Sequence, residues 1–531
     1  MIVRDLLVLT VAALVARTAA ALIVDYPPYT DPAYYAMVAE RLATGHGFSA
    51  PVLWSFLEVG GSLPAEPMLP VPSNRHWLPL TSIVSAGSMA LLGTTWRAAQ
   101  LPMILLSASL VPFTYLVGWS LWRSRLVARA GAVLAIFGGP LLVMYPLVDN
   151  FAIFGAAGAT ALVCATQAVR AGHPGVWLVA SGAAAGLATL ARIDGALLAI
   201  APAAAWLVRG SWAPLTSRLA WGTASALAFV AIVAPWLWRN VSVFGTALPS
   251  AGGHTLWLTT YNEQFTISYE PTLAAYLDWG VGNIIGSKLM AWGELTGRIA
   301  VLLGGIFIIG FAYGLWEGRR RPELAPFVAY FVGMFVVMGA VFTFHAPRGA
   351  FYHSAPGWLP FALPMAVAGM APAADAIGRL WPFLRRARTQ RFLIFAGLAG
   401  AIVLSLVGSG VLLGQWAVSR GRLEQAAVFL RGRDATGDAV MTYDPAALWS
   451  ITGNPGVAPP FDGFEVIGSV AEAYDVRWVV VTLGPGETRD PLGLWDGAAG
   501  MDRDGRRPDF LPAAPAFEAP GVRVYEVEPP T

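Results

Sequence analysis

The chain has 531 residues, of which 56% are hydrophobic and only 12% are charged, and its net charge is +2. A soluble domain of ordinary composition carries about 25% charged residues, so this composition excludes a large soluble enzyme and a disordered scaffold. The small net charge gives no electrostatic argument for a nucleic-acid partner. A single cysteine, Cys164, excludes an intrachain disulfide and a cysteine-based metal cluster. We therefore predict a polytopic α-helical membrane protein.

Apolar segments long enough to cross about 30 Å of hydrocarbon recur through most of the chain before its tail. We predict about eleven transmembrane helices. Their predicted limits are Asp5–Val24, Gln100–Trp122, Leu126–Tyr145, Asn150–Val169, Val176–Ala191, Gly195–Val208, Leu219–Trp238, Ile299–Trp316, Ala325–Phe344, Gly357–Ile377 and Phe392–Trp416. A further apolar segment, Pro79–Gly93, is short and rich in Ser, Gly and Thr, which favours a helix lying at the membrane interface.

The positions of the arginines predict the orientation of these helices. With the N-terminus in the cytoplasm, the arginine-rich connections, including Arg319–Arg321 and Arg385–Arg391, fall on the cytoplasmic side. The opposite loops are longer and hold most of the acidic residues. An odd number of spans then places the C-terminus outside. We expect a multi-pass protein of the cell (inner or plasma) membrane, surrounded by membrane lipids.

Three segments lack the composition of a transmembrane helix, namely two outer loops at 25–98 and 239–298 and the tail at 417–531. In the tail, Arg422–Arg431 has the pattern of a short amphipathic helix. Three further segments have the pattern of strands separated by turns rich in glycine and proline: Ala439–Tyr443, Arg477–Leu483 and Val522–Val527. We therefore predict a transmembrane domain at 1–416 and a small extracytoplasmic α/β domain at 417–531.

The first outer loop opens with D-Y-P-P-Y-T-D-P-A-Y-Y, from Asp25 to Tyr35. Asp31 stands before Pro32, which suits the first turn of a helix, so Asp31 has the position of an N-cap. Capping is one interpretation of this carboxylate. The other is a functional site, because a carboxylate among tyrosines at a membrane surface is partly desolvated and its pKa rises toward that of a general base. The neighbouring candidates for substrate binding are Tyr29, Tyr34 and Tyr35.

A second acid, Asp149, lies in M-Y-P-L-V-D-N on the same predicted side of the membrane. It is placed to cap the fourth transmembrane helix. It is equally placed to meet Asp31, and two acids at one face of a membrane protein favour a functional site. We take Asp31 and Asp149 as the candidate catalytic residues, with capping as the alternative for each.

Basic groups on this predicted side are few. Guanidinium groups near the headgroups suit a lipid phosphate or diphosphate, whereas the alternative is snorkelling and ion pairing, such as Arg192 with Asp194. The candidate substrate-binding residues outside the tyrosine motif are Arg75, His76, Arg192, Arg239, His345, Arg348, Tyr352 and His353. His345 and His353 are eight residues apart, which is not a compact spacing for two metal ligands. We expect no cofactor and leave a divalent metal open, and no phosphate-binding glycine motif supports nucleotide binding.

The order of these features resembles the GT-C class of integral-membrane glycosyltransferases, which includes protein O-mannosyltransferases and the aminoarabinose transferases that act on lipid A. The resemblance covers most of the chain: one helix, a long outer loop that opens with an acid and aromatic residues, many further helices, and an α/β tail. The residues that carry it are Asp31 in D-P-A-Y-Y-A-M-V-A-E-R-L-A-T-G-H-G-F, Asp149 in Y-P-L-V-D-N, and the segments G-L-A-T-L-A-R-I-D-G, P-W-L-W-R-N-V-S-V-F-G and R-G-A-F-Y-H.

The resemblance implies a polyprenyl-phosphate sugar donor and inverting transfer to an acceptor hydroxyl on the extracytoplasmic face. It implies that Asp31 is the general base, that Asp149 orients the acceptor or the sugar, and that Arg192 and Arg348 lie near the lipid phosphate. It leaves the acceptor open between a glycan, a lipid and a protein. The protein mannosyltransferases carry Asp-Glu where this chain has Asp31-Pro32, which argues against their protein acceptor.

Two other classes of function stay open at this point. A multi-span transporter or flippase of lipid-linked or envelope substrates would place charged residues and broken helices at the membrane midplane, and Arg17 is the clearest charge within a predicted span. An envelope assembly protein would use the tail as its binding module. The acids gather at the outer boundary of the membrane and not at its midplane, which favours the glycosyltransferase.

Overall fold

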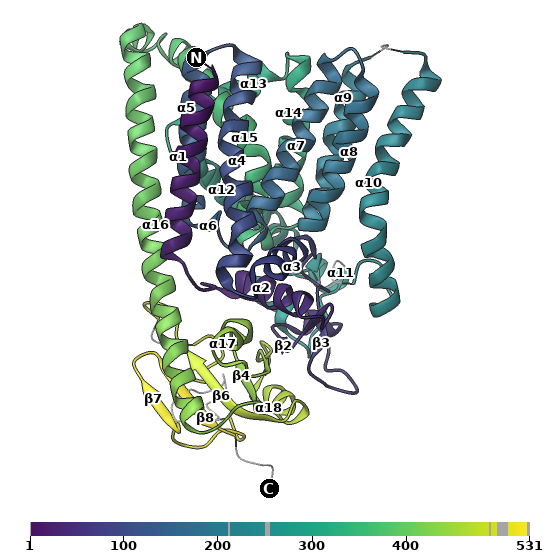
Figure 1. Cartoon of the computed structure of the whole chain (residues 1–531), viewed down its shortest axis with the longest axis vertical. Coiled ribbons are helices and arrows are strands. Elements are labelled where there is room, and N and C mark those ends of the chain that lie inside the picture. The colour runs from purple at the N-terminus through teal and green to yellow at the C-terminus, as the bar shows by residue number, and fades with distance from the viewer. Residues whose placement is uncertain (1, 211–212, 250–254, 488–489, 496–507, 528–531) are drawn as a thin grey trace.

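The computed structural model describes residues 2–210, 213–249, 255–487, 490–495 and 508–527. A bundle of long helices meets a smaller mixed unit of helices and strands at one end, and the chain begins at the opposite end of the bundle (Figure 1). We refer to the end of the bundle that meets the mixed unit as the sheet end.

Eight helices in the described part of the chain are long and apolar enough to cross a membrane, and a ninth crossing results if one bent pair counts as a single span. The eight are α1 (Ile2–Ile23), α4 (Trp96–Trp122), α7 (Asn150–Arg170), α8 (Pro174–Ala191), α10 (Leu215–Phe244), η5 with α14 (Pro322–Leu324 and Ala325–Ala340), η6 with α15 (Ala346–Ala350 and Phe351–Ile377) and α16 (Ala387–Gly432). A short 3-10 helix, η7 (Pro382–Arg385), precedes α16. The multi-pass architecture is confirmed, whereas the predicted count of about eleven spans is not.

The predicted span Leu126–Tyr145 is two helices, α5 (Arg125–Phe137) and α6 (Leu141–Met144). Gly138 and Gly139 separate them with φ of 53° and 60°. These are left-handed values that glycine adopts without a Cβ clash. Hydropathy alone does not register such a break, because the segment stays apolar throughout.

The buried Arg17 of α1 satisfies the backbone at this break. Its guanidinium donates to the carbonyl oxygen of Ala135 at 3.0 Å and to that of Leu142 at 3.4 Å. It also lies 4.4 Å from the centre of the Tyr145 ring. The charge predicted within the first span therefore binds carbonyl groups that the broken helix leaves without a partner.

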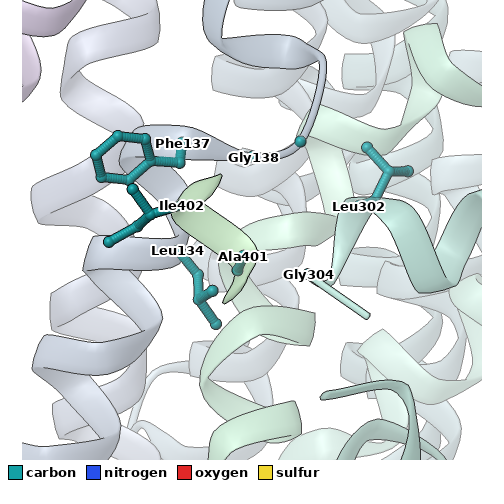
Figure 2. Close-up of a pocket in the computed structure, with 8 residues that line it drawn as sticks. Leu134, Phe137, Gly138, Leu302, Gly304, Ala401 and Ile402 are labelled. Carbon is teal, nitrogen blue, oxygen red and sulfur yellow. The ribbon is translucent and has the colours of Figure 1, made fainter. Parts of the chain in front are cut away.

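The predicted span Ile299–Trp316 crosses a sharp bend between α12 (Val281–Leu302) and α13 (Phe307–Gly318), whose axes differ in direction by 108°. Gly304 and Gly305 make the bend with φ of 80° and 77°. A small void of about 10 Å³ lies beside this bend, where α5 and α16 approach it. Figure 2 draws the residues that line it. The void has room for no more than about one water molecule.

The predicted span Gly195–Val208 is a 3-10 helix, η2 (Ile193–Ala199), that continues into α9 (Ile200–Val208). Together they are shorter than a membrane span. A Cβ at Gly195 would lie 2.4 Å from the carbonyl carbon of Ala188, so only glycine allows η2 to fold back this closely on α8. That tight turn fixes the backbone at Arg192.

The first predicted loop contains the helices α2 (Thr30–Ala43), η1 (Phe56–Val59) and α3 (Leu80–Leu92). The helix α3 corresponds to the predicted interfacial segment, and it lies beside α2 at the sheet end (Figure 1). The second predicted loop, 239–298, is partly helical. In this segment α10 continues to Phe244 and α12 begins at Val281, with η4 (Tyr261–Phe265) and α11 (Leu273–Asp278) between them.

The mixed unit is built around a sheet with strand order β2-β5-β4-β6-β8-β7. The strands are β2 (Val52–Leu53), β4 (Ala439–Thr442), β5 (Gly456–Val457), β6 (Val476–Thr482), β7 (Phe517–Ala519) and β8 (Val522–Glu526), with helices α17 (Pro445–Thr452) and α18 (Phe464–Ala473). The β2, β5, β4 and β6 strands are parallel, while β8 pairs antiparallel with β6 and β7. The three strands predicted in the tail match β4, β6 and β8.

Two features join the mixed unit to the bundle. The strand β2 comes from the first loop and pairs with β5 of the tail, as Val52 opposite Gly456. The helix α16 runs without interruption through the predicted boundary at 416/417, so the helix predicted at 422–431 is its last part. A second, two-stranded sheet, β1 (Ser49–Ala50) with β3 (Val71–Pro72), stays within the first loop.

The helix α15 is the centre of the bundle and packs against α4, α5, α7 and α13. Its middle is buried on all sides, with Trp358 and Phe361 at 0% exposure. The N-terminal end of α15 is therefore held firmly at the sheet end, where it presents His353 and Ser354.

Candidate active site

Asp31 lies in the first turn of α2, at the sheet end of the bundle. The N-cap of this helix is Tyr29, and Asp31 makes no capping hydrogen bond, so the predicted capping role of Asp31 is wrong. Its position in the helix leaves the carboxylate free to point away from the backbone. The side chain is 27% exposed, in contrast to the acids behind it.

Asp149 is the N-cap of α7, as the sequence predicts. One carboxylate oxygen accepts a hydrogen bond from the backbone N–H of Asn150 at 2.6 Å, and the other accepts from the Tyr29 hydroxyl at 2.7 Å. The side chain is completely buried. Asp149 therefore caps α7 and also belongs to the acid cluster.

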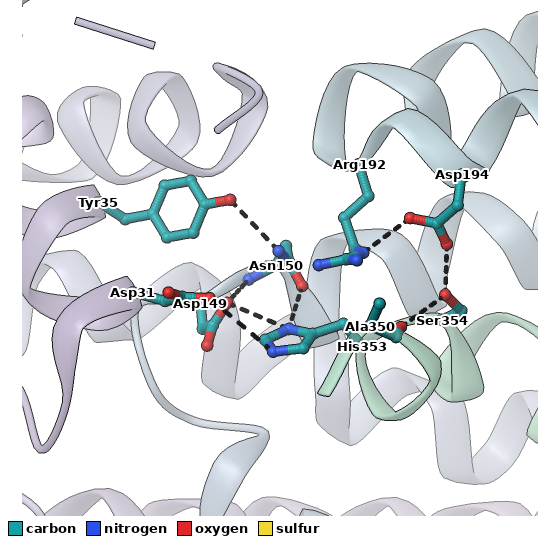
Figure 3. Close-up of polar contacts among 9 residues, drawn as sticks. All are labelled: Asp31, Tyr35, Asp149, Asn150, Arg192, Asp194, Ala350, His353 and Ser354. Carbon is teal, nitrogen blue, oxygen red and sulfur yellow. Dashed lines mark hydrogen bonds and ion pairs between the residues drawn. The ribbon is translucent and has the colours of Figure 1, made fainter. Parts of the chain in front are cut away.

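His353 connects the two acids (Figure 3). Its Nε2 is 3.9 Å from an Asp31 oxygen, and its Nδ1 is 3.6 Å from an Asp149 oxygen. The same Nδ1 lies 2.7 Å from the Asn150 side-chain oxygen. An amide oxygen only accepts, so Nδ1 donates to Asn150 and Nε2 is left to face Asp31. The ring stacks on Phe151 at 4.1 Å, which fixes its plane.

The Arg192 guanidinium approaches this cluster from the end of α8 and points toward Asn150 (Figure 3). Its Nε donates to Asp194 at 2.9 Å, and the Ser354 hydroxyl donates to the other oxygen of Asp194. The side chains of Arg192 and Asp194 are 18% and 5% exposed. The predicted ion pair with Asp194 is present, and it holds the guanidinium beside the acids.

Asp31 and Asp149 both have pKa values above that of a free aspartate. Burial, and then the neighbouring Asp149 carboxylate, raise the pKa of Asp31 to about 7. Burial also raises the pKa of Asp149, against the hydrogen bonds from Tyr29 and Asn150. The positive charge of Arg192 opposes both shifts. An Asp with a pKa near neutral pH is suited to accept a proton in a reaction.

Asp31 forms part of the wall of a cavity of about 550 Å³ between the bundle and the mixed unit. The cavity walls come from the start of α2, the segment after β2, the η4 helix, α16 and the loops of the mixed unit. This volume lies in the range of about 300–1,000 Å³ that small-molecule sites occupy. Of the three clustered side chains Asp31, Asp149 and His353, Asp31 is the one that lines the cavity.

The tyrosines of the first motif divide between two places. Tyr29 bonds to Asp149, and the Tyr35 hydroxyl lies 3.2 Å from the Asn150 side-chain nitrogen, so both belong to the cluster. Tyr34 points elsewhere and donates to Glu58 at 2.7 Å. Its position is that of a buried structural residue beneath the site.

Three of the predicted basic residues lie near Tyr34, and one of them, His76, also lies beside Trp77, the side chain that bonds to Asp31. The backbone N–H of His76 donates to Glu58 at 3.1 Å, and burial lowers the pKa of His76 to about 4. Arg75 and Arg239 both lie over the Phe244 ring, at 5.1 and 4.8 Å from its centre. We place Arg75 and Arg239 outside the candidate active site, whereas His76 contacts it through Trp77.

The later loop contributes to the edge of the cavity. Arg348 lies over the ring of Tyr261, 4.8 Å from its centre, and His345 Nε2 is 3.0 Å from the Gln264 side-chain oxygen. Both therefore contact η4, which lines the cavity through Tyr261. Tyr352 is turned away and packs under Arg298 at 5.0 Å.

Sequence reasoning missed Trp77, which bonds to Asp31, and also Asn150, Phe151 and Ser354. Asn150 and Phe151 follow Asp149 directly, and this position next to a candidate acid could have identified them as site residues. Ser354 carries no comparable signal, because its contact with Asp194 joins residues 160 positions apart.

Asp31, Asp149 and His353 offer three ligand atoms that all lie within 4.8 Å of one another. Two carboxylates and an imidazole are a donor set that divalent cations such as Zn²⁺ accept. Asp149 already accepts a hydrogen bond on each oxygen, and His353 Nδ1 is engaged by Asn150. Asp31 has a side-chain hydrogen bond from Trp77, so His353 Nε2 is the one of these ligand atoms that faces Asp31 without such a bond in the described cluster.

No family model and no curated protein matches the sequence. Among solved structures, ArnT from Cupriavidus metallidurans bound to undecaprenyl phosphate has a TM-score of 0.55 and 13% identity, over 98% of this chain and 97% of that chain. Its apo structure has a TM-score of 0.56 and 14% identity over the same shares. The archaeal oligosaccharyltransferase AglB from Archaeoglobus fulgidus, in complex with an inhibitory peptide and a dolichol-phosphate, has a TM-score of 0.54 and 12% identity, over 89% of this chain and 69% of that chain.

These similarities extend over the helical bundle and the mixed unit together, since the ArnT structures cover nearly the whole chain. At this level of identity they establish the fold. The chain therefore has the fold of the GT-C class of integral-membrane glycosyltransferases.

Proposed function

We propose that this protein transfers a sugar from a polyprenyl-phosphate donor to an acceptor hydroxyl, with inversion and with Asp31 as the general base. The observation that carries the proposal is the Asp31 carboxylate, which lines a 550 Å³ cavity with a pKa raised to about 7. The fold supports the donor class, because the similar ArnT and AglB structures hold undecaprenyl phosphate and a dolichol-phosphate.

In the proposed reaction, Asp31 removes the proton of the acceptor hydroxyl. The acceptor oxygen forms a bond to the anomeric carbon while the bond from that carbon to the phosphate oxygen breaks. The polyprenyl phosphate leaves with the electron pair, and attack from the face opposite to it inverts the configuration. Because the leaving group is already an anion, it needs neutralisation of charge more than protonation.

The residues behind Asp31 would set its position and its charge. Asp149 raises the proton affinity of Asp31, and His353 Nε2 faces it at 3.9 Å. Arg192 supplies positive charge close to both acids, and Arg348 at the cavity edge is a second cation for the donor phosphate. We assign Arg192 and Arg348 to the lipid phosphate and Asp149 to positioning.

For the orientation, we propose that the N-terminus is cytoplasmic and that the mixed unit lies outside the cell membrane. The arginine-rich connections Arg319–Arg321 and Arg385–Arg391 belong to the end of the bundle opposite to the mixed unit. Short connections rich in arginine stay in the cytoplasm. Transfer would then take place on the extracytoplasmic face.

A transporter or flippase is the alternative, and it has less support. The charge within the first span, Arg17, is buried and bonds to carbonyl groups of the α5–α6 break. The acids lie at the sheet end and not in the middle of a span. These positions favour chemistry at the end of the bundle over passage through it.

The test is transfer of labelled sugar from a panel of polyprenyl-phosphate sugars in proteoliposomes. We expect Asp31→Asn to lose about 10²–10⁴-fold in rate while donor binding is retained. Asp25→Asn is the matched control, because Asp25 is an exposed acid of the same loop. Equal loss in both variants, or uptake of the lipid-linked sugar without any acceptor, would overturn the proposal.

A further inference from the structure

The cavity in front of Asp31 is walled by a run of aromatic rings from three separate segments. Trp54 follows β2, Tyr261 and Phe265 belong to η4, and Phe461 follows two prolines of the mixed unit. The ring centres of Trp54 and Phe265 are 6.0 Å apart, those of Phe265 and Phe461 are 5.6 Å apart, and those of Tyr261 and Phe265 are 5.7 Å apart. Trp54 and Tyr261 meet Phe265 edge to face, at 77° and 69°, and Phe461 is tilted from Phe265 by 37°. The rings therefore form one contiguous wall whose faces point in different directions.

The backbone holds two of these rings in place. The N–H of Phe461 donates to the carbonyl oxygen of Phe265 at 3.1 Å. The next side chain, Asp462, accepts from the backbone N–H groups of Ile267 at 2.8 Å and Ser268 at 3.2 Å. The segment that follows η4 is thereby fixed to the mixed unit, and the aromatic surface has a defined shape before any ligand binds.

The charged groups of the cavity are mainly acidic. Among the described residues that line it, the charged ones are Asp31, Arg420, Asp444 and Glu487. The single cation in this set, Arg420, is already paired with Glu424, from its Nε to a carboxylate oxygen at 2.7 Å. An anionic group on a ligand inside the cavity would meet three carboxyl groups and one neutralised guanidinium, which disfavours it there. Arg348, which we assign to the donor phosphate, lies at the edge of the cavity and not in this set.

Carboxylates and aromatic rings together match one class of ligand. The C–H bonds on the face of a sugar ring carry small positive charges, and the face of an aromatic ring is negative. Sugar hydroxyls donate to carboxylate oxygens, which only accept. An unmodified peptide would need backbone partners along an extended edge, and a phosphorylated acceptor would need free cations.

From this combination we infer that the cavity is the acceptor site, and that the acceptor is a neutral or amino-bearing saccharide that packs against the aromatic wall, with one ring stacked on Phe461. The hydroxyl or ammonium groups of the saccharide donate to Glu487 and to the remaining lone pairs of Asp444, whose two oxygens each accept one hydrogen bond, from Thr30 and from Ala447. One further hydroxyl is directed to Asp31. This inference rests on the proposed function and narrows it, since it selects a glycan over a protein or a phosphorylated lipid.

Direct binding tests the inference without depending on transfer. The full chain in nanodiscs, labelled with a fluorophore, is applied to an array of neutral, amino-bearing, sulfated and phosphorylated oligosaccharides. We expect binding to neutral or amino-bearing glycans. We expect Phe461→Ala to weaken it about two- to tenfold, whereas Phe461→Tyr, which keeps the ring, stays near wild type.

Asp444→Asn tests the exclusion of anions. The asparagine oxygen retains the helix cap that Asp444 makes with the N–H of Ala447 at 3.0 Å, so the fold is preserved while the charge is removed. We expect the ratio of anionic to neutral glycan binding to rise several-fold. A residue with only a structural role would leave that ratio unchanged.

Three outcomes would overturn the inference: no glycan is bound, anionic glycans are preferred by the wild type, or Phe461→Ala binds as well as the wild type. Each differs from failure of the proposed function, which appears in the transfer assay. If the protein binds no glycan but transfers sugar to an added peptide in an Asp31-dependent reaction, the saccharide acceptor is wrong and the proposed glycosyltransferase activity stands. If the protein binds neutral glycans but transfers no sugar, the cavity is a saccharide-binding site and the proposed enzymatic activity is wrong.

Discussion

The hydroxyl of Thr30 donates a hydrogen bond to the carboxylate of Asp444 at 3.0 Å, across 414 positions of the sequence. Thr30 begins α2 and precedes Asp31, while Asp444 begins α17 of the mixed unit. The bond therefore ties the start of the helix that carries Asp31 to the unit that forms the opposite wall of the cavity.

We expect Thr30→Val to loosen this tie. Valine has a size similar to threonine but no hydroxyl, so the change leaves a partly buried carboxylate oxygen without this donor, at a cost of about 0.5–1.5 kcal/mol. Hydrogen exchange measured by mass spectrometry should become faster in α17, at 445–452. Thr30→Ser keeps the hydroxyl and is the control. Unchanged exchange in Thr30→Val would show that the bond contributes nothing to docking.

The pH dependence of transfer should follow Asp31. Its pKa is raised to about 7, so the base is protonated and inactive below this value and available above it. We expect kcat/KM to fall about tenfold per pH unit below pH 6 and to level off above pH 8. A profile that is flat between pH 5 and pH 8 would contradict Asp31 as the base.

The same shift makes a prediction about stability. Between the unfolded pKa of about 4 and the folded value of about 7, the folded protein binds more protons than the unfolded chain. Stability contributed by Asp31 therefore falls as pH rises through this window. Asp31→Asn should melt at a higher temperature than the wild type at pH 8, and this difference should shrink at pH 4. A lower melting temperature at pH 8 would contradict the argument.

Arg192 is expected to be necessary for both stability and activity. Replacing it with Met leaves the buried Asp194 carboxylate without its partner, and breaking a buried ion pair costs about 3–5 kcal/mol. The double variant Arg192→Met with Asp194→Asn should recover stability, measured by thermal unfolding, without recovering transfer. Recovery of transfer would show that Arg192 serves the fold alone.

Chelation by EDTA should leave the rate of transfer within about twofold. Asp149 and His353 Nδ1 are already satisfied by Tyr29 and Asn150, and the proposed reaction neutralises the phosphate with guanidinium groups. A loss of transfer that one divalent cation restores would assign Asp31, Asp149 and His353 as metal ligands instead. Equilibrium dialysis with Zn²⁺ or Mn²⁺, in wild type against His353→Ala, measures the same property directly.

The sequence predicts the elements whose pattern is local. The apolar segments predict most of the transmembrane helices, and the short apolar segments between glycine- and proline-rich turns predict β4, β6 and β8. The breaks at Gly138–Gly139 and Gly304–Gly305 escape such a prediction, because both lie inside segments of uniform hydropathy. A two-residue strand such as β2 is too short for any periodicity to appear.

For the site, the two acids could be named from their motifs, but the contacts between them could not. His353 reaches Asn150 across 203 positions, and its place depends on how α15 packs in the middle of the bundle. The expected cap at Asp31 is wrong because α2 begins two residues earlier than predicted, at Thr30 with Tyr29 as its N-cap. Helix limits shift easily by one or two residues, and here that shift frees the carboxylate.

The helix α16 has 46 residues, which corresponds to a length of about 69 Å, more than twice the thickness of about 30 Å that it must cross. Its excess length carries the mixed unit at a set height above the bilayer and at a set angle around the axis. Each added residue would lift that unit by about 1.5 Å and turn it by about 100°. The number of residues in α16 therefore fixes both the height and the rotation of the mixed unit relative to the bundle. We expect the length of this helix to vary far less between related chains than the loops on either side of it.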